Sequence, residues 1–549
     1  MSTLFDIFGF ASVLLEGLDR VAQTVLIGSA LFALVFAPAH PAREDAIDAG
    51  ATIRIVRASA LALVVTSLLL TLFNALILGS SLELSPALIA GARFVTGGAT
   101  RVVAAILILV IAGYPRPWSI AVRVALIALC ALILMESAAG SHAAARLVDS
   151  AAMYAATFAH QLGAALWLGG LPAFRGELLR RRGQDAAMLG RRYSIASIIG
   201  VLLVVAGAVG FAVDYIGSLQ GAYGTAYGVM AIGKAILLGL LLLLGLHNFI
   251  TFRRTGADAD AIARVRRIVA VEMGVAFAAV MAAGSITSTP PAVDLQQDRV
   301  TLSELAMRWR PLLPRFESPD HASLMLPALQ AQLDAQWRHR QDSARPLAFV
   351  PGAGAVAPRN ASDVAWSEYN HHWAGLLVFA MGVAALLARA GVPWARHWPL
   401  LFLGLAVFVF LRGDPEVWPL GEVGFFASLK DPEVVQHRVF VLIMVAFALF
   451  EWRVQRGGDA SPRAALVFPM LVAIGGTLLL THSHALGNVK EELMVETSHL
   501  PIAVLGVVAG WSRWLEVQAP KARDGRIGAW LWPVCFIVIG ALLLNYREA

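Results

Sequence analysis

The sequence predicts an all-α fold, a polytopic bundle of transmembrane helices, and three observations support this prediction. Hydrophobic residues make up 58% of the 549-residue chain and charged residues only 15%, a balance that suits lipid better than water. Apolar runs of about twenty residues, the length that crosses about 30 Å of hydrocarbon, recur from end to end. Nothing alternates in the manner of a membrane β-barrel, and a lipid-exposed strand edge would leave backbone groups without hydrogen bonds.

We expect fourteen spans, eight before a polar joint and six after it. The expected ranges are 18–38, 58–80, 94–113, 119–137, 150–171, 194–216, 228–250, 268–288, 372–390, 397–412, 437–453, 465–483, 499–515 and 529–545. They divide the chain into an eight-helix domain at 1–288, a linker at 289–365 and a six-helix domain at 366–549. The linker begins with the breaker run TSTPPAVD, and we expect weak local structure there with one amphipathic helix around LPALQAQLDAQW.

Arginines set the expected orientation of the chain. The loop between the fifth and sixth spans and the loop between the seventh and eighth are rich in them: Arg175, Arg180, Arg181, Arg182, Arg191 and Arg192, then Arg253, Arg254, Arg264, Arg266 and Arg267. By the positive-inside rule these loops are cytoplasmic, which places both termini and the linker in the periplasm of a Gram-negative cell. The net charge of +6 is therefore mostly a topology signal and gives no reason to expect a nucleic-acid partner.

Cysteine usage argues against a disulfide framework. The two cysteines, Cys130 and Cys535, each lie inside an apolar run and far from any C-x-x-C pattern. We expect both to be ordinary buried residues.

Two histidines mark the first half of the chain. His142 lies in the expected external loop ESAAGSHAAARL, and His160 lies about 15 Å deep in the fifth span at 1.5 Å per residue. An ionisable side chain at that depth is costly without a partner, so a functional role is the first interpretation and a neutral imidazole bonded to a neighbouring helix is the alternative. Met153, His160 and Trp167 are seven residues apart and share a helix face, which suits a soft cation but also ordinary packing. The auxiliary candidates are Met135, Glu136 and Asp214.

The second half carries six histidines near the ends of expected spans, and the alternating helix directions bring all six to the external face. They are His371, His372, His437, His482, His484 and His499. Neutral imidazole is a common ligand of copper, zinc, iron and nickel, so this convergence predicts a metal site, with a pH-sensitive or hydrogen-bonded cap as the alternative. Acidic and thioether side chains expected at the same face are Asp414, Glu416, Glu491, Glu492 and Met494.

Several stretches resemble the CopD family of bacterial copper-resistance and copper-uptake membrane proteins. They are GSHAAA, HQLGAALWLGGLPAF and VEMGVAFAAVMAAGSITSTPP, so that residues 18–317 look like the family's eight-helix domain. The second half, with EYNHHWAGL and THSHALGNVKEELMVETSHL, looks like the extension of longer members. The resemblance implies copper as the metal, movement across the inner membrane from the periplasm, and a periplasmic carrier of the CopC type as partner. It carries over His142 and His160 as functional residues.

Three functions follow as hypotheses. In the leading one, the protein is not an enzyme: external histidines collect copper, and His142 and His160 pass it inward. The second is a b-type haem electron carrier or metalloreductase, in which His437 with His482 or His484, or His372 with His499, ligates haem b. The third is a periplasm-facing copper sensor or assembly factor that binds copper without transporting it. The sequence leaves the oxidation state of copper and the number of subunits open.

Overall fold

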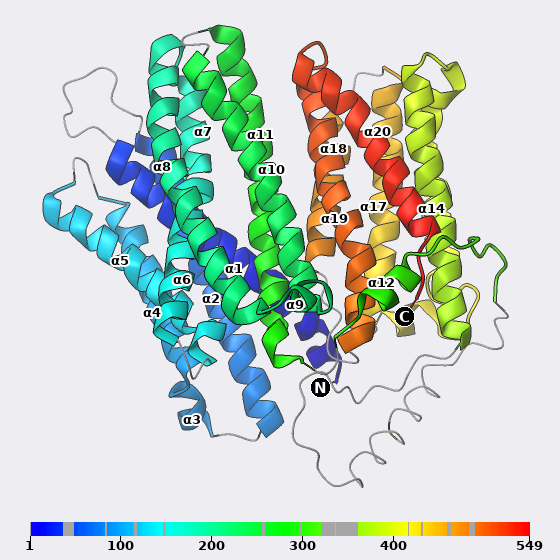
Figure 1. Ribbon diagram of the computed structural model, residues 1–549, viewed down its shortest axis with the longest axis horizontal. Coiled ribbons are helices and arrows are strands. Elements are labelled where there is room, and N and C mark those ends of the chain that lie inside the picture. Colours follow the sequence, from blue (N-terminus) through cyan, green and yellow to red (C-terminus); the bar gives the residue numbers. More distant parts are fainter. Residues whose placement is uncertain are drawn as a thin grey trace. The chain divides into compact units, whose positions relative to one another are not determined.

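The computed structural model is helical in the part of the chain that it describes (Figure 1). That part comprises residues 2–36, 49–82, 85–114, 118–145, 150–254, 258–296, 299–319, 335, 361–415, 417–429, 432–457, 463–481 and 489–548. Among these residues the only β pairing is an isolated bridge between Val417 and Val423. The predicted all-α fold class is confirmed.

Eleven of the described helices are long and apolar enough to cross a membrane, judged by length and composition. All fourteen expected segments contain helix, but 150–171, 437–453 and 465–483 are not among the eleven. The first contains the polar residues His160 and Gln161, and the last forms a shorter apolar helix at Ala464–Leu480. The protein is thus a multi-pass membrane protein, while the count of fourteen spans and the external termini stay predictions.

The chain forms two compact units. Unit 1 comprises Met1–Gly9, Leu219–Gly233 and Pro290–Ala549, and unit 2 comprises Phe10–Ser218 and Lys234–Thr289. The break between Thr289 and Pro290 falls next to the expected end of the eight-helix domain. Residues 290–319 of the expected linker belong to unit 1, and the stretch LPALQAQLDAQW lies outside the described residues, apart from Ala335.

Helices of the first 289 residues include long spans and two π-helical turns. They are α1 (Ser2–Phe36), α2 (Ala49–Leu82), α3 (Pro86–Ala90), α4 (Arg93–Ile111), α5 (Ile120–Ala139), the 3-10 turn η1 (His142–Ala145), α6 (Ser150–Ala164), the π turn η2 (Ala165–Gly169), α7 (Leu171–Arg180), α8 (Gly183–Phe211), the π turn η3 (Ala212–Ile216), α9 (Leu219–Tyr223), α10 (Ala226–Arg254) and α11 (Ala259–Ser288). Polar side chains cap the N-termini of some of these helices. Ser119 accepts a hydrogen bond from the amide of Val122 in α5, and Asp258 accepts two from amides at the start of α11.

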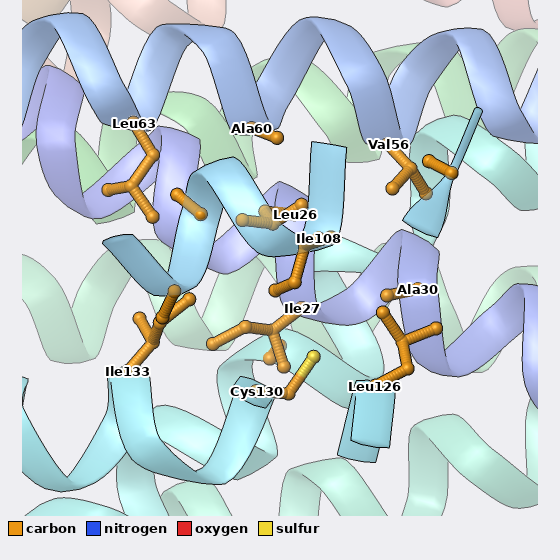
Figure 2. Packing of buried hydrophobic residues seen from close by; sticks show 14 of the residues in the cluster. Leu26, Ile27, Ala30, Val56, Ala60, Leu63, Ile108, Leu126, Cys130 and Ile133 are labelled. Atoms are coloured by element: carbon orange, nitrogen blue, oxygen red, sulfur yellow. The ribbon is translucent and has the colours of Figure 1, made fainter. Parts of the chain in front are cut away.

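The core of unit 2 joins α1, α2, α4 and α5. Leu26 and Ile27 of α1 are fully buried against Leu63 of α2, Ile108 of α4 and neighbouring side chains (Figure 2). Cys130 of α5 lies in the same cluster and is only 3% exposed. This confirms the prediction of an ordinary buried cysteine, and Cys535 in unit 1 is buried and free as well.

The two arginine-rich groups lie at one end of unit 2. Arg266 of α11 donates from Nε to the carbonyl of Leu178, 3.1 Å away, and from Nη2 to that of Arg181, 2.6 Å away. Both carbonyls belong to the end of α7. The basic groups that the positive-inside rule uses are therefore side by side, as a common membrane face requires.

Unit 1 contains the remaining helices, and α18, α19 and α20 pack side by side in it (Figure 1). They are the 3-10 turn η4 (Ala292–Asp294), α12 (Leu302–Arg308), α14 (Ala361–Arg389), η6 (Pro393–Leu400), α15 (Leu401–Arg412), α16 (Phe425–Ser428), α17 (Pro432–Gln455), η7 (Ala464–Leu466), α18 (Val467–Leu480), α19 (Val489–Gln518) and α20 (Arg523–Leu544). Aromatic residues fill its core, with Phe468 and Trp532 at most 1% exposed and their ring centroids 6.0 Å apart.

A buried ion network ties the helices of unit 1 together. Arg513 of α19 is 5% exposed and binds Glu451 of α17, with a second bond of 2.7 Å to Glu516. Glu516 also accepts a 2.6 Å bond from Arg389 of α14 and a 2.8 Å bond from Trp532 of α20. Because each buried charge has an opposite charge within bonding distance, the cost of desolvating them is offset.

Candidate functional site

A row of four aromatic rings in unit 2 connects the two histidines predicted for the first half of the chain. His142 in η1 meets the ring of Tyr215 in η3 with 6.0 Å between centroids. Tyr215 stacks on Phe211 at 5.6 Å, and Phe211 stands 5.2 Å from His160. The row therefore runs from the loop after α5, along the end of α8, to the interior of α6.

The tautomer of His160 follows from its hydrogen bond. Its Nδ1 lies 3.0 Å from the carbonyl oxygen of Val204 in α8, which accepts hydrogen bonds only, so Nδ1 must donate. In the neutral ring Nε2 then carries the lone pair, and this atom makes no hydrogen bond to the described residues. A carbonyl that holds one imidazole nitrogen and leaves the other for a metal is the usual support of a histidine ligand. The same hydrogen bond also agrees with the alternative interpretation, in which His160 is a neutral imidazole bonded to a neighbouring helix.

Glycines allow α6 and α8 to approach closely enough for this contact. A Cβ atom on Gly207 would stand 2.6 Å from the Cβ of His160, and one on Gly200 would stand 2.7 Å from the carbonyl of Gly163. Real Cβ atoms essentially never lie within 3.0 Å of another heavy atom of this kind. The position of His160 against α8 thus depends on the absence of side chains at these two positions.

The auxiliary candidates of the first half have varied surroundings. Met153 is buried in α6 at 1% exposure, whereas Met135 is 59% exposed. Glu136 pairs with Arg93 at 3.1 Å, and Asp214 precedes Tyr215 in η3. The last candidate, Trp167, belongs to a separate polar cluster.

That cluster centres on a buried carboxylate that the sequence reasoning missed. Glu272 of α11 is 3% exposed and accepts a 3.0 Å bond from Nε1 of Trp167 and a 2.9 Å bond from Nδ2 of Asn248 in α10. The hydroxyl of Tyr193 donates to the carbonyl of Trp167. No basic side chain of the described residues forms an ion pair with Glu272. An acidic residue inside the long apolar run of 268–288 was the available signal, because such residues in membrane spans are seldom without a role.

A second polar network crosses α1, α2, α4 and α6. Asp19, 1% exposed, pairs with Arg101 and accepts hydrogen bonds from Thr66 at 2.9 Å and from Ser67 at 2.6 Å. Gln23 continues it by accepting a 3.1 Å bond from Arg101 and donating a 3.2 Å bond to Gln161. Gln161 is the neighbour of His160 in the chain, so buried polar groups reach α6 from this side as well.

In unit 1 the structure brings two of the predicted histidines around one tyrosine. His371 of α14 stacks on Tyr546 with 3.8 Å between centroids, and His499 of α19 meets the same ring edge-on at 6.1 Å. The two imidazoles are 6.3 Å apart. His371 donates from Nδ1 to the carbonyl of Ser367 at 2.8 Å, which leaves the lone pair on Nε2 as in His160.

His372 differs from its neighbour because both of its nitrogens are engaged. Nδ1 accepts a 2.7 Å bond from the amide of Arg315, so Nε2 donates to the carbonyl of Tyr546 at 2.9 Å. The ring is 4% exposed. It thereby attaches the irregular segment around Arg315 and the C-terminal end of the chain to α14, and it has no lone pair left for a metal.

The other predicted residues of the second half are only partly described. His437 of α17 binds Asp414 through Nδ1 at 2.6 Å, an arrangement that orients imidazoles in many metal sites. The carbonyl of Met494 accepts a 3.4 Å bond from Arg308. His482, His484 and Glu416 lie outside the described residues, as do the side chains of Glu491 and Glu492.

A comparison with protein families bears directly on unit 2. Residues 187–286 match the model of the family described as CopD, copper resistance protein D. Residues 187–286, called the CopD domain below, are similar to this family. Comparison with curated proteins and with solved structures gave no match. The resemblance stated from the sequence is confirmed over this range, and the second half lies outside it.

The CopD domain supplies half of the histidine row. Val204, Gly207, Phe211 and Tyr215 lie within the matched residues, as do Asn248 and Glu272 of the buried cluster. His142 and His160 precede the match but contact it through Tyr215, Phe211 and Val204. The family relates the protein to copper resistance or uptake at a membrane.

The described residues do not by themselves assemble a metal centre. Within them, no group of three or more histidine, cysteine, aspartate or glutamate side chains stands close enough to hold a metal ion. His160 and His371 each offer one imidazole nitrogen. The predicted external cluster of six histidines stays a prediction, since two of the six lie outside the described residues.

Proposed function

We propose that the protein binds copper at the periplasmic face of the bacterial inner membrane and moves it toward the cytoplasm, with His142 and His160 as successive ligands. The observation that carries the proposal is the row of rings from His142 through Tyr215 and Phe211 to His160. Half of this row belongs to the CopD domain, whose family is tied to copper resistance.

The chemistry of the row suits a soft cation. Neutral imidazole accepts both oxidation states of copper, and the carbonyl of Val204 holds His160 in the tautomer whose Nε2 can ligate. Between the two histidines, the faces of Tyr215 and Phe211 offer a desolvated cation an electrostatic attraction. In this arrangement copper is cargo, and each imidazole binds it and releases it to the next group.

In unit 1 the pair His371 and His499 is the proposed collecting site at the external face. His371 lies over the face of the Tyr546 ring and His499 at its edge, with 6.3 Å between the two imidazole centroids. A periplasmic carrier of the CopC type is the proposed donor of copper to this face. His482 and His484 are further proposed ligands in the same region of the sequence.

The proposal is tested by copper uptake into proteoliposomes that contain the purified full-length protein. We expect His142→Ala and His160→Ala each to lower the initial rate at least about tenfold, because loss of even an outer-shell partner of a metal ligand has an effect of about this size. The control is His247→Ala, because this histidine is exposed on α10 and away from the row.

Each failure has a separate meaning. Unchanged uptake in His160→Ala refutes the route, and copper binding without uptake by the wild type favours a sensor or assembly factor. An absorption spectrum of the same sample decides the haem alternative, since haem b has a Soret band that copper lacks.

A further inference from the structure

A cavity of about 290 Å³ lies in unit 2 between α8 and α10, beside α7 and α11. Its walls are mostly aliphatic and aromatic, and the buried cluster of Trp167, Asn248 and Glu272 forms part of the lining. The lining residues used below are Ser194, Ile198, Val201, Leu202, Phe249 and Phe252. Ile198 and Leu202 are about half exposed or more, so the wall is open to the surrounding hydrocarbon.

The cavity adjoins a basic rim. A second cavity, lined by Arg191, Arg253, Ser194, Phe249 and Phe252, shares its last three residues with the first. Both arginines are anchored at this rim: Nε of Arg191 lies 3.5 Å from the carbonyl of Phe252, and the guanidinium of Arg253 lies 5.5 Å from the centroid of Phe249. Two positive charges from two different helices therefore converge on the mouth of an apolar pocket.

The dimensions match one lipid chain below one headgroup. Ten residues of α8 separate Arg191 at the rim from Val201 in the wall, a distance of about 15 Å along a helix. Arg191 of α8 and Arg253 of α10 belong to the two arginine-rich groups at one end of unit 2, where the expected cytoplasmic leaflet meets the helices. Basic pockets between membrane helices on that side bind anionic headgroups.

We infer that this cavity is a binding site for one anionic phospholipid, whose phosphate lies between Arg191 and Arg253 and whose acyl chain lies along α8 beside Val201. Copper is excluded as the occupant of the rim because both arginines repel a cation. A free phosphate would use the rim and leave the apolar wall empty. A zwitterionic lipid would use the wall but gain little from the two charges. The inference does not depend on copper transport.

The test is native mass spectrometry of delipidated full-length protein titrated with phosphatidylglycerol or with phosphatidylcholine of the same chain length. We expect one molecule of phosphatidylglycerol to bind to each protein molecule, with a higher affinity than phosphatidylcholine. The double variant Arg191→Ala with Arg253→Ala should bind phosphatidylglycerol about 30-fold more weakly, the change that about 1 kcal/mol per arginine produces. Its affinity for phosphatidylcholine should not change.

Two further variants distinguish lipid binding in this cavity from general electrostatic attraction of an anionic lipid to a basic surface. Arg180→Ala with Arg254→Ala removes the same charge from positions that do not line the cavity, and it should bind phosphatidylglycerol like the wild type. Val201→Trp fills the wall and should weaken both lipids; a cooperative thermal transition shows that the variant is folded. Three outcomes would each overturn the inference. They are an equal loss of affinity for phosphatidylglycerol in the two arginine double variants, equal affinity of the wild type for the two lipids, and full displacement of phosphatidylglycerol by inorganic phosphate.

Discussion

Glu272 of α11 and Trp167 of η2 are joined by a hydrogen bond of 3.0 Å in the interior of unit 2. The second oxygen of the carboxylate is occupied by Asn248. Two donors on separate helices thus converge on a buried carboxyl group that forms no ion pair among the described residues. Hydrogen bonds from Trp167 and Asn248 stabilise this buried group. The effect of a substitution at Glu272 therefore depends on whether the new side chain can form the same bonds.

The first prediction concerns this carboxylate. Glu272→Gln should change the melting temperature little, because rotating the Asn248 amide lets its oxygen accept from the new amide while the glutamine oxygen accepts from Trp167. Glu272→Leu should lower stability by about 1–3 kcal/mol for each donor left unpaired. Thermal unfolding of both variants in the same detergent is the measurement. Equal melting temperatures for the two variants would contradict this account.

The second prediction concerns the contact between α6 and α8. Gly207→Leu places a side chain where even a Cβ atom would stand 2.6 Å from His160, and such overpacking costs about 1–3 kcal/mol. Displacing His160 should also lower copper uptake. Gly239→Leu is the matched control, since a Cβ there meets nothing within 4 Å. The account fails if both variants melt and transport alike.

The third prediction separates two adjacent histidines. His371→Ala should lower the amount of copper bound by the purified protein, because its Nε2 carries a lone pair. His372→Ala should leave copper binding unchanged but weaken the attachment of the segment around Arg315, because both ring nitrogens are used there. Elemental analysis measures the first effect and limited proteolysis near residue 315 the second. Loss of copper in His372→Ala alone would reverse the two assignments.

The fourth prediction addresses the ion network of unit 1. Arg513→Met leaves Glu451 and Glu516 without their shared partner, and breaking a buried pair in this way costs about 3–5 kcal/mol. Adding Glu451→Gln to that variant should recover part of the loss. Chemical denaturation of the single and double variants measures both changes. A double variant less stable than the single one would show that the charges are not coupled.

The sequence predicts the class of this fold well because long apolar runs have one main interpretation in a membrane. It also singles out His142 and His160 in the first half, because a histidine in or beside an apolar run is visible in the sequence itself; their role stays a prediction. It does not reveal that Tyr215 and Phe211 lie between them, because these rings belong to a helix more than forty residues away from His160. Ordinary aromatic residues of an apolar helix carry no such signal.

Other features of the candidate site could not be predicted from the sequence, for different reasons. His371 and His372 look equivalent in the sequence, and only the backbone partners at Ser367, Arg315 and Tyr546 distinguish a ring with a lone pair from one without. Asn248 and Glu272 lie on two helices, 24 residues apart. The convergence of six histidines rests on helix directions, and it remains a prediction of topology.

The glycines of α8 restrict how unit 2 can work. A Cβ atom on either Gly163 or Gly200 would stand within 2.7 Å of the carbonyl oxygen of the other, so α6 has little room to slide or roll against α8. A rotation by one residue, roughly 100°, would drive the side chain of a neighbouring position into that backbone. Any passage of an ion along this interface therefore relies on torsions of individual rings, with the two helices acting as a fixed wall.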